Sequence, residues 1–185
     1  LSESIEQLWR IADQVENQLL VVGIAVPTAN ALYNCAAVLN NGEIIGIVPK
    51  EFVPNYNEFE EGQWFASARE EDLPKTVNIG GEDVPFGTRL LFESNNSMGQ
   101  KDRVFIEVCE AIWMTIPPSC LGAIGGANII LNPSTSTETV GKPDLRRAHV
   151  ISQSGRGVCV YAYCSSGPTE STNDVVCGGH DMIAE

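Results

Sequence analysis

The sequence contains no apolar run that approaches the roughly 18 residues of a membrane-spanning helix. It is also poor in basic residues, because 11 lysines and arginines stand against 24 aspartates and glutamates, for a formal net charge of -13. A surface with this excess of negative charge repels nucleic-acid phosphates and anionic membranes. We therefore expect no nucleic-acid partner and no membrane partner, and solubility is the simplest explanation of the charge.

Patterns for metal binding are missing as well. The six cysteines form no Cys-x-x-Cys pair, and the two histidines, His149 and His180, show no ligand spacing. A zinc site is therefore not expected, and no metal ion is assigned. Most of the cysteines stand in apolar surroundings, which is typical of reduced thiols in a core, so we predict a cytoplasmic location.

The 185 residues are enough to bury a sizeable core, and the expected elements alternate between helix and strand. Apolar residues at helical spacing predict a first helix, with Ser2 or Ser4 as its N-cap. Asn-Gly at 41–42 predicts a hairpin turn. The other expected strands are 19–26, 33–39, 44–48, 104–109, 128–132 and 158–164, and a hairpin joins 77–79 with 84–92. A long loop is expected over 54–76, one helix is expected to begin near 117–119, and another to span 145–155. Hairpins followed by β-α-β units predict a layered α/β fold with a mixed sheet.

Two of the apolar runs end in residues that carry chemistry. The run before Cys109 is rich in β-branched residues, and a glutamate and an alanine follow the cysteine at once, which is how a nucleophile is presented at a sharp turn. Lys50 ends a second run. A thiolate nucleophile needs a base, which a glutamate can supply, and a cation can stabilise the oxyanion of the reaction. Taken singly, Cys109 is explained as readily by an inert core thiol, and Lys50 by a solvated lysine.

Several motifs in a fixed order favour the catalytic explanation of Cys109 and Lys50. They are PKEFVPNYNEFEE at 49–61, EVCEAIW at 107–113 followed by PPS at 117–119, NPSTS at 132–136, GKPDLRR at 141–147, and YAYCSSGPTESTND at 161–174 with GHDMIAE behind it. From about Val21 to the last residue, this ordered set resembles the nitrilase superfamily of carbon-nitrogen hydrolases. More narrowly, it is similar to the amino-terminal glutaminase domains of glutamine-dependent NAD synthetases.

The resemblance implies a nitrilase-like α-β-β-α layered sandwich that is incomplete, because the first β-α-β portion of the family is missing. Residues 1–185 would form a single partial glutaminase domain, and the ATP-dependent synthetase domain would be absent. The segment that carries the glutamate base of the Glu-Lys-Cys triad has no counterpart here, and Glu3 and Glu6 are not substitutes for it. Ala111 also departs from the family, which usually has aspartate at this position.

The resemblance also implies the roles of individual residues. Cys109 would form the γ-glutamyl thioester, and Lys50 would be the triad lysine. The backbone N–H after Cys109 would complete the oxyanion hole together with Lys50. Tyr56 and Glu61 match positions in the loop that lines the glutamine pocket.

Three further positions match the substrate pocket of the family. Trp113 would pack against the substrate, although a core position explains it as well. Ser136 and Lys142 would touch the amino-acid end of glutamine, and a cation at 142 suits the α-carboxylate. A simpler role for Ser136 is to cap the following turn.

The implied function is glutamine hydrolysis that supplies ammonia for the conversion of deamido-NAD to NAD. This region would need no cofactor, whereas ATP and Mg would belong to the synthetase domain. The implied partners are glutamine, the synthetase domain of the same protein, and further copies in a homo-oligomer. Without its base, a thiolate loses ~10²–10⁴-fold in rate, so we expect little activity from the chain alone. Two alternatives stay open, namely a stand-alone nitrilase-type amidohydrolase acting on a small amide, and a non-catalytic nitrilase-fold interaction domain.

Overall fold

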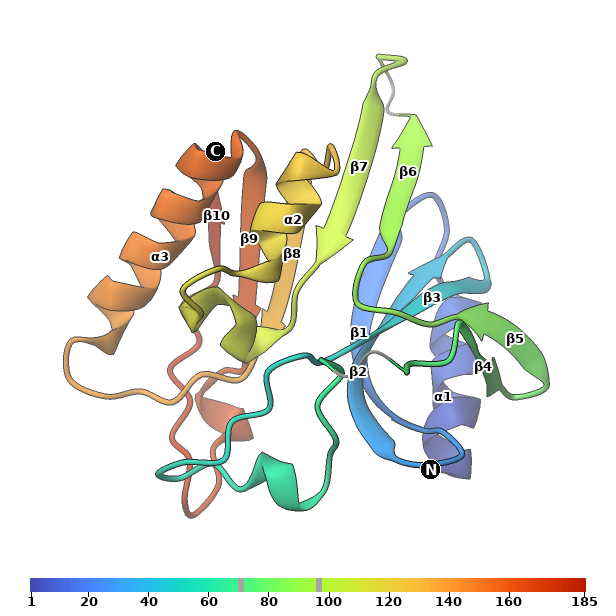
Figure 1. Cartoon of the computed structure of the whole chain (residues 1–185), viewed down its shortest axis with the longest axis horizontal. Coiled ribbons are helices and arrows are strands. Elements are labelled where there is room, and N and C mark those ends of the chain that lie inside the picture. Colours follow the sequence, from blue (N-terminus) through green and yellow to red (C-terminus); the bar gives the residue numbers. More distant parts are fainter. Residues whose placement is uncertain (70–71, 96–97) are drawn as a thin grey trace. The chain divides into compact units, whose positions relative to one another are not determined.

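The computed structural model describes residues 1–69, 72–95 and 98–185 (Figure 1). The chain divides into two compact units, Leu1–Leu90 and Leu91–Glu185, here called unit 1 and unit 2. The prediction of a single partial domain stays a prediction. In the described ranges, no helix is long and apolar enough to span a bilayer.

Unit 1 begins with helix α1 (Ser2–Ala12) and an antiparallel sheet in the order β1 (Leu19–Pro27), β2 (Leu32–Asn40) and β3 (Glu43–Pro49). The sheet confirms the expected hairpin, because Asn41 and Gly42 have φ of 46° and 83°. This left-handed backbone is the one for which Asn-Gly is suited. The predicted serine cap is wrong, since α1 starts directly after Leu1 and no side chain caps it.

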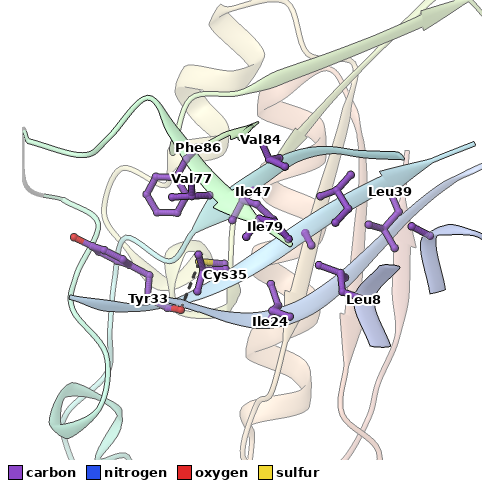
Figure 2. Packing of buried hydrophobic residues seen from close by; sticks show 14 of the residues in the cluster. Leu8, Ile24, Tyr33, Cys35, Leu39, Ile47, Val77, Ile79, Val84 and Phe86 are labelled. Carbon is purple, nitrogen blue, oxygen red and sulfur yellow. Dashed lines mark hydrogen bonds between the residues drawn. The ribbon is translucent and has the colours of Figure 1, made fainter. Parts of the chain in front are cut away.

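The core of unit 1 forms where α1 and the hairpin of β4 (Thr76–Ile79) and β5 (Glu82–Pro85) pack against the sheet (Figure 2). Trp9 of α1 donates from Nε1 to the Ile79 carbonyl at 3.3 Å. The predicted strand over 84–92 is wrong, because the hairpin ends at Pro85 and Phe86 then forms a bridge with Ile47 of β3. A short 3₁₀ turn, η1 (Glu61–Gln63), lies in the long loop.

Unit 2 contains a mixed sheet, whose order in the part of the chain that the structure describes is β10-β9-β8-β7-β6. Its strands are β6 (Leu91–Asn95), β7 (Lys101–Ile106), β8 (Ile129–Ser134), β9 (Val160–Ser165) and β10 (Met182–Ala184). The three central strands are parallel, and β6 and β10 pair antiparallel at the edges. The expected mixed α/β fold is therefore confirmed, although β10 was not predicted.

Helices α2 (Pro118–Ile124) and α3 (Lys142–Gly157) connect the parallel strands and contact each other. A 3₁₀ turn, η2 (Cys109–Trp113), follows β7, and another, η3 (Pro168–Glu170), follows β9. A Cβ atom at Gly122 would lie 2.5 Å from the Phe105 ring, so glycine lets α2 approach β7 closely. The buried face of this sheet carries Phe105, Ile130 and Tyr161, which are aligned across β7, β8 and β9.

Candidate active site

Lys50 directly follows β3, and its side chain is buried, with 3% of the residue exposed. Backbone hydrogen bonds hold it from both sides, to the Asn34 carbonyl at 2.8 Å and from the Ala68 N–H at 3.0 Å. Its ammonium group forms an ion pair with the Glu61 carboxylate, and the Asn34 side chain donates to the same carboxylate at 2.5 Å. A buried lysine requires such a partner, because an unpaired charge is costly to desolvate.

Glu61 thus has a contact that the sequence did not predict. The motif assigned it to the lining of a substrate pocket, whereas the structure places its carboxylate on Lys50. Tyr56, from the same loop, is 51% exposed and packs edge-to-face against Phe59, with ring centroids 5.9 Å apart. Unit 1 therefore brings Lys50 and Glu61 together and presents Tyr56 at its surface.

Cys109 lies at the sharp turn that the sequence predicts, three residues after β7 ends. Its φ of 52° is left-handed, a conformation that costs energy for any residue other than glycine. Its backbone N–H donates to Asn132 Oδ1 at 3.0 Å, and its thiol donates to the Thr135 carbonyl at 3.6 Å. The expected strand over 104–109 is too long, since Cys109 begins η2.

Behind Cys109 lies a chain of buried polar side chains that sequence reasoning missed. Asn132, Tyr161 and Glu107 are 1%, 0% and 2% exposed. Asn132 Nδ2 donates to the Tyr161 hydroxyl at 2.9 Å, and that hydroxyl donates to Glu107 at 2.5 Å. Burial, and next the Glu107 charge, raise the pKa of Tyr161, so the hydroxyl keeps its proton. Strand periodicity was the available signal, because Asn132 shares the buried face with Ile130.

Trp113 and Lys142 are brought together in unit 2. The Lys142 ammonium lies 5.7 Å from the centroid of the Trp113 ring and donates to Thr137 Oγ1 at 2.7 Å. The indole is also in edge-to-face contact with His149, with centroids 5.0 Å apart. Trp113 also packs against the core of unit 2, so both the substrate contact and the core position stay predictions.

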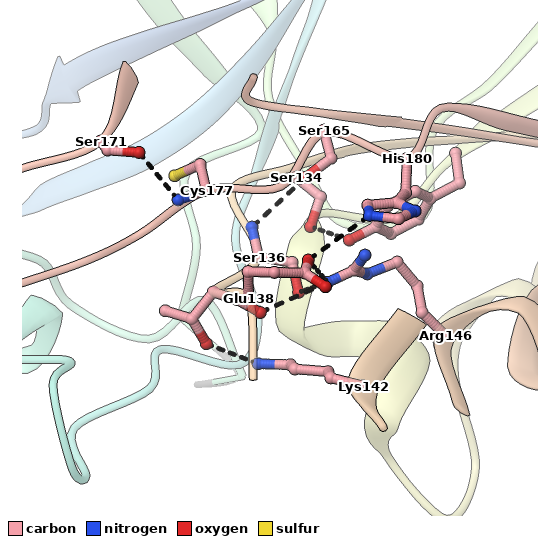
Figure 3. Close-up of polar contacts among 11 residues, drawn as sticks. Ser134, Ser136, Glu138, Lys142, Arg146, Ser165, Ser171, Cys177 and His180 are labelled. Atoms are coloured by element: carbon pink, nitrogen blue, oxygen red, sulfur yellow. Dashed lines mark hydrogen bonds and ion pairs between the residues drawn. The ribbon is translucent and has the colours of Figure 1, made fainter. Parts of the chain in front are cut away.

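Ser136 is buried, and its hydroxyl accepts a hydrogen bond from Arg146 Nη2 at 3.0 Å (Figure 3). Arg146 is fully buried, and it also faces Glu138, with Nη2 and Oε2 3.5 Å apart. His180 approaches the same carboxylate at 3.6 Å. Arg146 is a further residue whose role the sequence does not predict, and it donates to the Ser136 hydroxyl.

The predicted site residues fall into two sets, each described within its own unit. Unit 1 holds Lys50, Tyr56 and Glu61, and unit 2 holds Cys109, Trp113, Ser136 and Lys142. All six cysteines are free thiols. Over 1–69, 72–95 and 98–185, no group of three or more His, Cys, Asp and Glu side chains is placed to hold a metal ion.

Comparison with known proteins gives a consistent result. No family model matches the chain. The glutamine-dependent NAD(+) synthetase of Mycobacterium bovis is 38% identical over 167 residues, which are 90% of this chain and 24% of that protein. The crystal structure of a glutamine-dependent NAD(+) synthetase from Cytophaga hutchinsonii matches with a TM-score of 0.82 at 26% identity, over 98% of this chain and 28% of that one.

A broader likeness of fold extends to Nit3 of Saccharomyces cerevisiae, a member of branch 10 of the nitrilase superfamily. The TM-score is 0.69 at 17% identity, over 98% of this chain and 56% of that one. The fold is therefore that of the nitrilase superfamily. More narrowly, the chain is a homologue of glutamine-dependent NAD synthetases and matches their glutaminase region. It spans about a quarter of the length of these relatives.

Proposed function

We propose that this chain provides the nucleophile and the lysine of a glutaminase site. The observation that carries the proposal is the presentation of Cys109, a thiol held in a left-handed turn after a parallel strand. The buried, ion-paired Lys50 at the end of β3 supports it, because such a lysine is held in one position. Homology to glutamine-dependent NAD synthetases supports glutamine as the substrate.

In the proposed reaction, Cys109 Sγ attacks the side-chain amide carbon of glutamine. The carbon–nitrogen bond breaks, ammonia leaves with the thiol proton, and a γ-glutamyl thioester remains. Water then cleaves the thioester to glutamate and restores the thiol. The backbone N–H after Cys109 and the Lys50 ammonium would stabilise the oxyanion. The N–H of Cys109 itself is not available for this role, because it donates to Asn132.

The proposed pocket uses the residues that the motifs indicate. Trp113 would contact the substrate. Lys142 would give up its hydrogen bond to Thr137 and pair with the α-carboxylate of the substrate. Ser136, held by Arg146, would accept from the substrate ammonium group, and Tyr56 would line the entrance. None of these residues is a general base, so we expect the chain alone to hydrolyse glutamine slowly.

The wider setting is also a proposal. The ammonia would serve the ATP- and Mg-dependent conversion of deamido-NAD to NAD on a synthetase domain of the same protein, in a cytoplasmic homo-oligomer. No cofactor is assigned to the region described here. These assignments follow the NAD synthetases that the chain matches over about a quarter of their length.

The test is covalent labelling with a diazoketone analogue of glutamine, read by intact mass and peptide mapping. Cys109 should be modified alone among the six cysteines, and Cys109→Ala should abolish the labelling. Cys164→Ala, which removes an exposed thiol, is the matched control and should leave it unchanged. Uniform or absent labelling would favour the non-catalytic interaction domain. If an assay panel showed simple amides to be hydrolysed and glutamine not, the stand-alone amidohydrolase would be the better assignment.

A further inference from the structure

The buried polar chain behind Cys109 has a single direction. The N–H of Cys109 donates to Asn132 Oδ1, Asn132 Nδ2 donates to the Tyr161 hydroxyl, and this hydroxyl donates to Glu107 Oε1. Every donor thus points toward the Glu107 carboxylate. Hydrogen bonds in such a series polarise one another and strengthen in a buried environment.

The direction is fixed at both ends. Glu107 Oε2 accepts from the Ser119 N–H at 2.7 Å, so each carboxylate oxygen has a donor from the described chain. Because Tyr161 gives its only proton to Glu107, its oxygen must accept from Asn132. The Asn132 amide can then adopt one orientation only, with its oxygen toward the Cys109 N–H. The Nδ2 of the same amide also lies 3.5 Å from the Cys109 carbonyl.

The Asn132 side chain therefore bonds both backbone groups of the residue that has φ of 52°. A non-glycine residue stays in this left-handed region only where its surroundings determine it. We propose that Asn132, Tyr161 and Glu107 are positioning residues that hold the Cys109 backbone, and with it the thiol, in this conformation. That these residues hold the Cys109 backbone rests on geometry alone. That this serves catalysis rests on the proposed function.

The first test measures the Cys109 backbone directly. In Tyr161→Phe, which removes only the hydroxyl, the Cys109 amide should exchange with solvent roughly tenfold faster by NMR, the effect expected from one lost buried hydrogen bond. The Ala127 amide, which donates to the Gly122 carbonyl, is the internal reference and should keep its rate. Ser154→Ala is the matched control, because it removes another buried hydroxyl of unit 2, bonded to the Cys159 carbonyl.

The second test measures how the thiol is aimed. The rate of Cys109 modification by the glutamine-like diazoketone is divided by the rate with iodoacetamide. Iodoacetamide is a small reagent that reacts with the thiol without first binding in one orientation. This ratio should fall roughly tenfold in Tyr161→Phe and stay unchanged in Ser154→Ala. Loss of stability alone would not move the ratio in folded protein. Glu107→Gln should change it in the same direction, since an amide can donate as well as accept and no longer imposes one orientation.

The outcomes separate the two proposals. If amide exchange and the rate ratio in folded Tyr161→Phe and Glu107→Gln both stay within twofold of the parent chain, the positioning role is wrong. If the parent protein shows no preference for the glutamine-like reagent at Cys109, the proposed function fails. The amide exchange still decides whether Asn132, Tyr161 and Glu107 hold the Cys109 backbone. Should Tyr161→Phe not fold, Glu107→Gln gives both readouts.

Discussion

The carboxylate of Glu61 lies against the ammonium group of Lys50, and Asn34 donates to that carboxylate from β2. The loop that the sequence connects with substrate therefore also determines the environment of the lysine. Removing one partner of a buried pair leaves the other charge uncompensated. We predict that Glu61→Gln lowers the free energy of unfolding by about 3 kcal/mol, measured by urea denaturation.

An exposed pair of unit 1 is the control for that experiment. Glu6 and Arg10 of α1 pair at 2.7 Å, and their side chains are 61% and 65% exposed. Exposed pairs contribute up to about 1 kcal/mol, so Glu6→Gln should have a small effect. Equal losses in the two variants would show that the Lys50–Glu61 pair is solvated in solution. Glu61→Gln should also slow diazoketone labelling of Cys109 if the lysine acts on it as proposed.

The left-handed backbone of Cys109 predicts an unusual ranking of substitutions. Glycine adopts φ of 52° without steric cost, whereas alanine does not. Cys109→Gly should therefore be more stable than Cys109→Ala by about 1 kcal/mol, although both lack the thiol. Thermal unfolding of the two variants decides this, and a more stable alanine variant would argue against the left-handed turn.

Close packing of α2 on β7 predicts opposite effects of two glycine substitutions. A Cβ at Gly122 would meet the Phe105 ring, so Gly122→Ala should destabilise by about 1–3 kcal/mol. Gly155 lies in α3, and a Cβ there meets nothing within 4 Å. Gly155→Ala should stabilise by about 0.5–1 kcal/mol, because alanine is the better helix former. Effects of the same sign in urea denaturation would contradict the described packing.

The buried thiol of Cys35 predicts a loss of stability at alkaline pH. Burial raises its pKa above the ordinary value of 9.0, so the folded chain keeps this proton while the unfolded chain releases it. Stability from this group is present below pH 9.0 and is lost above it, at ~1.4 kcal/mol per pH unit. Cys35→Ala should flatten the decline between pH 9 and 10 in urea denaturation.

Val38→Ala is the matched control for this pH dependence. Val38 is a buried residue of the same strand, and it cannot titrate. Its substitution should lower stability by a similar amount at every pH and keep the slope of the parent chain. If Cys35→Ala kept that slope too, the thiol would already be accessible to solvent in the folded chain.

Much of the fold follows from local patterns in the sequence. The Asn-Gly turn and the continuous apolar runs identify β1 to β3, and the strand before Cys109 is recognisable although it ends earlier than expected. The interval 84–92 does not form one strand, because Phe86 bridges to β3 and a separate strand, β6, begins at Leu91. Local periodicity does not distinguish one long strand from two short ones that pair with different partners.

The site was predictable where a side chain carries reactivity, and not where it acts through another residue. Cys109 and Lys50 are identified by their position after apolar runs and by the motifs around them. Tyr161 and Arg146 also stand in these motifs, but neither is reactive by itself. Their importance comes from contacts with Asn132, 29 residues away, and Ser136, ten residues away. Such pairs follow from the parallel register of β8 and β9 and from the packing of α3, which only the fold provides.

Lys50 and Cys109 each depend on a support from their own unit. The Lys50–Glu61 pair is held by residues of unit 1, and the backbone of Cys109 is held by Asn132 in unit 2. A directed-evolution library of the loop around Glu61 should therefore keep Glu61 fixed and randomise its neighbours, and a library around Cys109 should keep Asn132 fixed.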